Sequence, residues 1–426
     1  MLPAQEIMER LGYTCSYSVV DKSLVCLKAN ASIVLTAGST QAMVNSNPVQ
    51  QLVSPYLAEG HLLVEARFLE SLGTMLVEWD EESESLQLYY YEELDYGLYF
   101  YDSEPNGWSH WDAIGCQKFV PGQENSYFDP SKPTIIWIHG WQNGGVTAKS
   151  RPGFHLNKDG VDKFVHNEWK NRGWNVAIFY WVPLADELLP NDAESKINAA
   201  TNNSVDMRWK KSNGDYVTDN MPTLPVAELF AQAYVQLAQS QTNSTIRLAG
   251  SSFGGQVALH GAERIKNNGI TPLPSRIALL DMAWTFNYVD NEGLYTNQIT
   301  ARAATTLSPL IPLEYYRTSA LTTLFTPDEL IEQSAFQEMI FGYAGLWGIE
   351  LKHVVATHHY FWSLEHDAPI AQDANQQSVG VALSAATDDA TVRQMMGTQY
   401  HWQHTEGTNT FTPSDDVFER QNGPGY

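Results

Sequence analysis

The chain has 426 residues, more than one hydrophobic core usually supports, so two domains are expected. With 43% hydrophobic and 17% charged residues it has the composition of a folded globular protein, and no stretch approaches the roughly 18 apolar residues that a membrane span requires. Its 49 acidic and 25 basic residues give a formal charge of −24, which excludes nucleic acids and anionic membrane surfaces as partners because both would repel it.

The first 92 residues contain an internal repeat. Residues 1–29 align with residues 62–90, and the matching positions are Leu2, Ile7, Met8, Glu9, Leu11 and Gly12 against Leu63, Phe68, Leu69, Glu70, Leu72 and Gly73. Each copy reads as a short helix followed by a β-hairpin; in the second copy we expect the helix to end at Gly73, a turn at 80–83, and strands at 75–79 and 86–90. No strand is expected before the helix of the first copy, which suggests a trimmed N-terminus.

Two cysteines lie in the first predicted hairpin. If the strands of this hairpin pair in the register assigned to the second copy, residues whose numbers sum to 41 lie opposite each other across the strands. Cys15 and Cys26 are such a pair, so a disulfide between them is within reach. Such a bond would fit an oxidising compartment. A slip of one residue would separate the two side chains, so two ordinary buried cysteines remain an equal alternative. Cys116 is left single.

The second copy carries RFLESLG and VEWDEES in that order, and here the sequence resembles the copper amine oxidase N-terminal-like stalk domain. The resemblance implies that residues 1–92 form a small, non-catalytic α+β domain of a secreted or cell-surface protein, a candidate for cell-wall association. Residues 1–6 carry no secretory signal of their own. No copper ligand is carried over, because His61 is the single histidine of this region and is expected to be an ordinary surface residue.

From residue 95 to 426 the pattern changes to apolar runs that alternate with amphipathic segments. This alternation predicts an α/β domain whose mostly parallel sheet is covered on both faces. The expected strands are 134–138, 175–180, 245–249 and 276–280, and the expected helices are 161–172, 225–241 and a segment that begins at Phe253. Two insertions, 184–222 and 286–345, fit no core element and are expected to cover the active site.

The sequence AGSSFGG places Ser252 in a GxSxG pattern between a strand and a helix. Small residues on both sides let the chain bend sharply and raise the serine hydroxyl at the carboxyl edge of the sheet. The helix that follows points its N-terminus at this hydroxyl, where free backbone amides favour developing negative charge. Ser252 is therefore the predicted nucleophile.

A serine hydroxyl is a poor nucleophile at neutral pH, so it needs a base and a group that orients the base. In α/β domains with a GxSxG turn, the three residues follow along the chain in the order Ser, then Asp or Glu, then His. Asp281 ends the strand 276–280 and is the expected carboxylate; Asp290 and Glu292 are weaker candidates. The alternative is that Asp281 is only a cap or turn residue, since aspartates at strand ends often form turns.

Three histidines compete for the role of base: His353, His358 and His359. From Val354 onward the segment looks like a helix, and the base should hang from the loop before it, which favours His353. His358 is the next candidate. His358 and His359 would both lie more than a turn inside the helix, where a structural role is expected.

An oxyanion hole needs two backbone donors. One should be the amide of Phe253, the residue after the nucleophile. The strand 134–138 leads into His139-Gly140-Trp141, where Gly140 lets the backbone fold towards the serine, so the amide of Trp141 is the predicted second donor. His139 is expected to be structural.

Together these motifs resemble the lipase family of α/β-hydrolases, especially the pancreatic and lipoprotein lipase branch. The resemblance rests on IHGW, AGSSFGG, the strand that ends in Asp281, and His353 followed ten residues later by Ser363-Leu364. The chain departs from the family at three positions without losing a catalytic group: the family's usual histidine, leucine and, often, proline are replaced by Ser251, Phe253 and Met282.

The resemblance implies a carboxylic ester hydrolase that acts on an ester or lipid substrate through an acyl-enzyme, without a metal or an organic cofactor. Thioesterases and amidases use the same scaffold, so they remain open. A different class of hypothesis is a catalytically silent binding module that the stalk domain presents at the cell surface.

Overall fold

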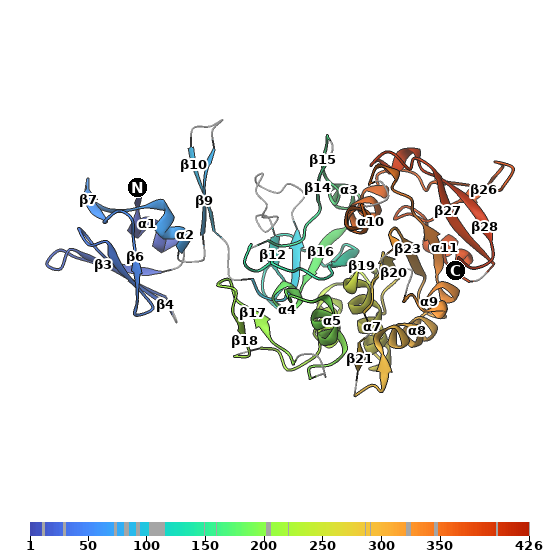
Figure 1. The fold of residues 1–426 in the computed structure, drawn as a ribbon, viewed down its shortest axis with the longest axis horizontal. Helices are drawn as coiled ribbons and strands as arrows, with labels where there is room; N and C mark the ends of the chain where they lie inside the picture. The colour runs from blue at the N-terminus through green and yellow to red at the C-terminus, as the bar shows by residue number, and fades with distance from the viewer. Residues whose placement is uncertain are drawn as a thin grey trace. The chain divides into compact units, whose positions relative to one another are not determined.

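The computed structural model divides the chain into two compact units, Met1–Glu93 and Leu94–Tyr426 (Figure 1). The structure describes residues 1–10, 13–28, 31–71, 75–80, 85–90, 94–101, 116–148, 150–158, 160–201, 206–219, 221–285, 287–289, 291–320, 325–344, 348–397 and 399–425. The predicted helix end at Gly73, most of the turn at 80–83 and the candidate Asp290 lie outside these residues. Within them, no helix combines the length and the apolar character needed to cross a membrane.

The first unit contains two helix–hairpin copies. Its helices are α1 (Ala4–Arg10) and α2 (Ala66–Ser71), and its strands are β1 (Leu2–Pro3), β2 (Thr14–Ser18), β3 (Ser23–Lys28), β4 (Ala31–Thr36), β5 (Gln41–Val44), β6 (Asn47–Gln50), β7 (Tyr56–Ala58), β8 (His61–Val64), β9 (Met75–Asp80) and β10 (Ser85–Tyr90). Contrary to the sequence prediction, a strand does precede α1: β1 pairs with β8, Leu2 opposite Val64. Two residues, one of them a proline, are too few to show strand alternation in a sequence.

The first hairpin has the predicted register. Cys15 lies opposite Cys26, and the two form a disulfide. The second hairpin does not share this register, because Met75 lies opposite Tyr90, whereas the repeat would place it opposite Leu88. A shift of two residues leaves each side chain on the same face of the hairpin, so the apolar pattern of the sequence does not distinguish the two registers.

The second unit is built on a twelve-stranded sheet with the order β12-β11-β16-β13-β19-β20-β23-β24-β27-β28-β25-β26. Its strands are β11 (Gly97–Tyr101), β12 (Cys116–Lys118), β13 (Thr134–Ile138), β16 (Asn175–Tyr180), β19 (Ile246–Ser251), β20 (Arg276–Leu280), β23 (Leu313–Arg317), β24 (Ala335–Glu338), β25 (Ile370–Gln372), β26 (Ser378–Val381), β27 (Tyr400–Glu406) and β28 (Val417–Asn422). From β16 to β27 neighbouring strands are parallel, and antiparallel pairs occur at both ends. The sheet is therefore mixed: the predicted parallel order holds for its centre and for the outer pair β25–β28, and the other pairs are antiparallel.

Helices cover both faces of this sheet (Figure 1). Along β13 the side chains alternate: Ile136 and Ile138 join the core under one set of helices, and Ile135 and Trp137 join the core under the other. The first set is α5 (Pro190–Asn198), α6 (Val226–Ser240), α7 (Phe253–Asn267), α8 (Thr296–Leu307) and α9 (Asp328–Gln333). The second set is α3 (Asn167–Asn171), α10 (Ile349–Ser363) and α11 (Asp389–Met395).

Shorter elements decorate the second unit. They are helix α4 (Val182–Ala185), the 3-10 turns η2 (Gly342–Ala344) and η3 (Pro413–Asp415), and the hairpins β14–β15 (His155–Lys158, Val161–Phe164), β17–β18 (Trp209–Lys210, Tyr216–Val217) and β21–β22 (Tyr288–Val289, Leu294–Tyr295). The predicted helix 161–172 is thus wrong in its first half, which pairs as β15 with β14 across a turn at Gly160, where φ is +84°.

The segment 286–345 is not a peripheral insertion, because it supplies β23 and β24 to the middle of the sheet. Strand β23 was missed because its sequence, LEYYR, carries a charged residue in the interior: Glu314 is buried and forms an ion pair with the buried Arg276 of β20. The residues after 366 also add β25 to β28 to the same sheet.

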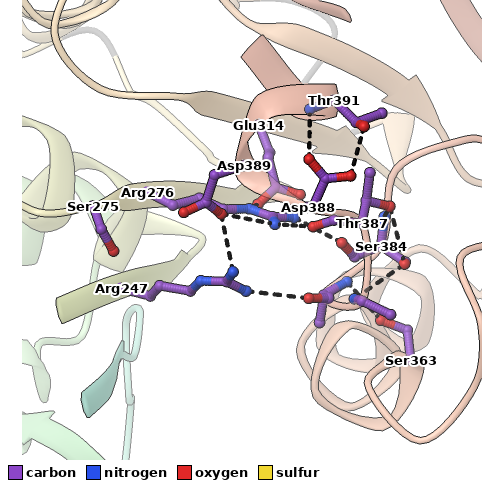
Figure 2. Close-up of polar contacts among 12 residues, drawn as sticks. Arg247, Ser275, Arg276, Glu314, Ser363, Ser384, Thr387, Asp388, Asp389 and Thr391 are labelled. Atoms are coloured by element: carbon purple, nitrogen blue, oxygen red, sulfur yellow. Dashed lines mark hydrogen bonds and ion pairs between the residues drawn. The ribbon is translucent and has the colours of Figure 1, made fainter. Parts of the chain in front are cut away.

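A polar network fastens this C-terminal segment to the amino ends of β19 and β20 (Figure 2). Arg276 donates to the carbonyl of Ser384 at 2.7 Å, and its guanidinium lies 3.4 Å from the carboxylate of Asp389. Arg247 of the neighbouring strand reaches the same carboxylate at 2.9 Å. Because Arg276 is fully buried, these acceptors and Glu314 stabilise a charge that would otherwise be costly inside the protein.

Candidate active site

Ser252 occupies a strained turn between β19 and α7, as predicted. Its φ and ψ are 54° and −129°, a conformation that residues other than glycine rarely adopt. The turn is tight because glycines flank it: a Cβ on Gly254 would lie 2.0 Å from the carbonyl oxygen of Ile138, and one on Gly250 would lie 2.5 Å from that of Gly254. These close backbone contacts explain why the GxSxG pattern requires glycine on both sides.

The structure brings Asp281 and His353 together. His353 Nδ1 lies 2.6 Å from Oδ2 of Asp281, which follows β20 directly. The carboxylate also accepts hydrogen bonds from the backbone N–H groups of Thr318 and Ser319 at 2.7 and 3.0 Å and from the Ser319 hydroxyl at 2.5 Å. Burial alone would raise the pKa of Asp281, but these hydrogen bonds and His353 hold it below its usual range. An ionised carboxylate is therefore fixed behind the imidazole.

His353 lies inside helix α10, not in a loop before it. The helix begins at Ile349, so the expected start at Val354 is too late by five residues. Gly348 is the residue directly before the helix, and the sequence pattern did not reveal this start of α10. The imidazole side chain is 19% exposed, which leaves Nε2 accessible while Asp281 holds Nδ1.

Ser252 and His353 line one cavity of about 580 Å³, a volume suited to a small organic ligand. In the described part of the chain, no hydrogen bond joins the serine hydroxyl to the imidazole. Ser252 and His353 thus line the same cavity, Asp281 is buried behind the imidazole, and the last contact of the predicted triad is open. Catalytic hydrogen bonds are often long in the absence of substrate.

The predicted oxyanion loop passes directly beside Ser252. A Cβ on Gly140 would lie 2.6 Å from Cβ of the serine. Among the described residues, neither the backbone N–H of Trp141 nor that of Phe253 has a hydrogen-bond acceptor, and both residues line the cavity. Two unoccupied backbone donors beside a serine are the elements that an oxyanion hole needs.

His139 is structural, as expected. It is fully buried, and its ring stacks on Trp181 with the ring centres 5.7 Å apart. Nε2 accepts a hydrogen bond from the Trp181 backbone N–H at 3.0 Å, so the proton resides on Nδ1, which lies 2.8 Å from the carbonyl of Gly140. Burial lowers the pKa of His139 to about 3, and the neutral ring thus fixes the start of the oxyanion loop.

A second element that holds this loop was not predicted. The buried carboxylate of Asp186 accepts hydrogen bonds from the backbone N–H groups of Gly144 and Val146, each at 2.8 Å. The indole N–H of Trp141 donates to the carbonyl of Glu187 at 2.8 Å. Both acidic residues belong to the predicted insertion 184–222, and nothing in their local sequence indicates this role, because the loop that they bind lies about 40 residues earlier.

Another unpredicted carboxylate supports the part of the cavity wall at Thr285. Glu194 of α5 is fully buried, and burial raises its pKa. It accepts hydrogen bonds from Gln256 of α7 at 2.6 Å, from Asn287 at 2.9 Å and from the backbone N–H of Thr285 at 3.0 Å. Since Thr285 lines the cavity, this network ties the cavity wall to the helix that follows Ser252.

The competing residues lie elsewhere or have other partners. His358 borders the cavity, and burial lowers its pKa to about 4. His359 points to a different carboxylate, Asp416, at 2.7 Å. Glu292 forms an ion pair with Arg302 at 3.0 Å. Of the candidates in the described residues, His353 is thus the histidine that the structure joins to Asp281 beside Ser252.

No group of three or more His, Cys, Asp or Glu side chains in the described ranges is arranged to hold a metal ion. In the first unit His61 is exposed, and its Nδ1 lies 3.2 Å from Glu6. One histidine beside one carboxylate does not provide a copper site.

A comparison with curated protein sequences gave no significant match. Among solved structures, the chain is similar to a Pyrococcus horikoshii acylaminoacyl peptidase (10% identity, 80% of this chain and 52% of that chain, TM-score 0.29). It is also similar to a Pyrobaculum calidifontis esterase (14% identity, 55% and 77%, TM-score 0.27) and to a prolyl endopeptidase (12% identity, 75% and 46%, TM-score 0.27). The match thus spans about half the length of the two peptidases, and these TM-scores are too low to support an argument. Residues 1–88 match the family model of the copper amine oxidase N-terminal domain.

Proposed function

We propose that residues 95–426 form a serine hydrolase of carboxylic esters. The oxygen of Ser252 attacks the ester carbonyl, and its proton passes to Nε2 of His353 while Asp281 stabilises the imidazolium. The bond to the alcohol then breaks, and the alcohol leaves with that proton. Water, deprotonated by the same histidine, attacks the acyl-enzyme and releases the carboxylic acid, which restores the serine.

The backbone N–H groups of Trp141 and Phe253 stabilise the negative charge that develops on the carbonyl oxygen in both steps. Their lack of other acceptors in the described residues supports this role. The contacts of His139 and Asp186 hold the loop in place before substrate arrives, so little reorganisation is required at the moment of reaction.

The observation that carries the proposal is the strained Ser252 on the same cavity as the His353–Asp281 pair. A fluorophosphonate probe tests it, because such probes react only with activated serines. We expect labelling of the wild-type protein at Ser252 and none of Ser252→Ala, while Ser251→Ala remains labelled. Labelling that persists in Ser252→Ala would contradict the assignment.

The lipase-like part of the proposal concerns substrate length. Leu188 and Leu189 are 71% and 53% exposed and directly precede Pro190, which lines the cavity. Two exposed leucines beside a site suit contact with long acyl chains. Turnover of p-nitrophenyl esters of increasing acyl length tests this: a lipase-like enzyme prefers long chains, and an esterase prefers short ones.

One observation favours the alternative of a silent binding module, namely the open contact between Ser252 and His353. Such a module would show neither fluorophosphonate labelling nor Ser252-dependent turnover of any p-nitrophenyl ester. Thioesterase or amidase activity would instead appear as labelling with faster turnover of the matched thioester or amide.

We further propose that the protein is exported to the cell surface, and features of the first unit support this location. The match of residues 1–88 and the disulfide between Cys15 and Cys26 support this part of the proposal. In protein taken from the native cell envelope, the two cysteines should react with a maleimide only after reduction. Reaction without reduction would indicate a reducing compartment and contradict it.

A further inference from the structure

The wall of the catalytic cavity is rich in tryptophan, and its indole N–H groups are already bonded. The donors and acceptors are Trp137 to the Ser251 hydroxyl at 3.1 Å, Trp141 to the Glu187 carbonyl at 2.8 Å, and Trp284 to the Thr300 hydroxyl at 3.0 Å. These three side chains therefore offer no free N–H donor to a substrate. Trp137 and Trp284 are each 5% exposed, so Trp141, which is partly exposed, presents most of the ring surface that can attract apolar groups and cations.

Glu350 is the acidic residue among the described residues that line this cavity, and no lysine or arginine is among them. It lies in the first turn of α10, three residues before His353, so the two side chains project from the same side of the helix. Within the described ranges, no basic side chain lies within ion-pair distance of Glu350. Its charge is therefore not neutralised by a neighbour.

The other titratable groups at the cavity do not offset this charge. His139 and His358 are neutral at pH 7, because burial lowers their pKa values to about 3 and about 4. The formal charge of the whole chain is −24, which adds a long-range field of the same sign. The cavity wall thus carries the exposed carboxylate of Glu350 together with aromatic side chains.

We propose that Glu350 makes this site selective for esters that carry a positive charge near the scissile bond, with quaternary ammonium esters as the chemical class that fits best. The inference rests on the proposed esterase function. A carboxylate attracts the cation, aromatic rings accept it without a hydrogen bond, and an ester that carries a carboxylate is repelled.

A matched pair of substrates isolates the charge. Butyrylcholine and 3,3-dimethylbutyl butyrate have the same shape and differ only in that a carbon replaces the charged nitrogen. At low ionic strength we expect kcat/KM to be about five-fold higher for the cationic ester, the size expected of one partly screened charge pair. Added salt should reduce this ratio, because the carboxylate is exposed.

Glu350→Gln should bring the ratio of kcat/KM values for the two esters close to one, and this ratio is compared between the variant and the wild type. The matched control is Glu329→Gln, an exposed glutamate in the first turn of α9 and away from the cavity, which should leave the ratio unchanged. If Glu350 only favours the helix N-terminus, Glu350→Gln will lower the Tm and leave the ratio as it was, which overturns the inference.

The two levels of the proposal fail in different ways. Equal kcat/KM values for the two esters, with turnover that depends on Ser252, would overturn the charge selectivity alone. If neither ester nor any p-nitrophenyl ester is turned over, the esterase proposal fails and this inference fails with it.

Discussion

Helix α10 carries the histidines of two histidine–aspartate pairs, one of which uses Nδ1 of its imidazole and the other Nε2. His353 lies 2.6 Å from Asp281, and His359, six residues later, lies 2.7 Å from Asp416. Six residues turn the chain by about 240°, so the two histidines leave the helix on different sides. The first pair faces the cavity that contains Ser252, and the second does not border that cavity.

The environment of each carboxylate explains the difference. Asp281 receives one imidazole and three other hydrogen bonds, and the imidazole keeps its second nitrogen accessible. Asp416 is shared by His359 and the buried His404, at 2.7 and 3.1 Å. A histidine–aspartate pair therefore does not identify a catalytic base. The base is identified by what the free nitrogen of the imidazole faces.

The largest expected effect comes from breaking each pair on its histidine side. His353→Ala should lower kcat for a p-nitrophenyl ester by roughly 10⁶-fold, because the nucleophile loses its base. Its Tm should also fall, because the buried carboxylate of Asp281 loses its imidazole partner, while the hydrogen bonds from Thr318 and Ser319 remain. Steady-state kinetics and thermal unfolding measure both quantities.

His359→Ala is the matched control on the same helix. It should keep its activity and lose about 2 kcal/mol of stability, because Asp416 is buried and loses one of its two imidazole partners. If the activity loss instead follows His359→Ala, the assignment of the base is wrong.

The next effect concerns the carboxylate. Asp281→Asn should reduce kcat by about 10⁴-fold, because an amide no longer stabilises the imidazolium and can hold the wrong tautomer. Asp416→Asn is its counterpart and should leave kcat nearly unchanged. Similar losses of activity in both variants would show that the second pair also serves catalysis.

A smaller effect on kcat is expected from changes in the loop at Gly140 and Trp141, which lies beside Ser252. Gly140→Ala adds a Cβ within 2.6 Å of Cβ of Ser252, so the loop and its Trp141 amide must shift. We expect a loss of about 10²- to 10³-fold in kcat with little change in KM, the size seen when one oxyanion donor is lost. A change in KM alone would indicate that the loop binds substrate without stabilising the transition state.

The sequence predicts the catalytic residues better than it predicts their surroundings. Ser252 is identifiable because a tight turn demands glycines at fixed positions, and Asp281 because it directly ends an apolar strand. His353 was preferred because it was expected in a loop, whereas it lies inside α10, where it contacts Asp281. Local pattern finds such residues because local backbone geometry positions them.

The supports of the site were not predictable in this way. Asp186 and Glu194 bind segments far away in the sequence, so no local signal marks them. Strand β23 was missed for a related reason, since Glu314 looks like a surface residue until Arg276 is placed opposite it. Buried polar contacts between distant segments depend on the complete fold, because the sequence around one residue does not show which distant residue will contact it.

The smallest expected effect is a change in how the Tm depends on pH when the carboxylate of the second pair is replaced. Burial alone would raise the pKa of Asp416, but His359 and His404 hold it well below its usual range. Because its pKa is lower in the folded protein than in the unfolded chain, the unfolded chain binds more protons below about pH 4, and the stabilisation is lost as the pH falls from there. Asp416→Asn should therefore have a Tm that varies less between pH 5 and pH 3 than that of the wild type. An equally steep decline in both proteins would assign the acid sensitivity to other carboxylates, among them Asp281, whose pKa is also lowered.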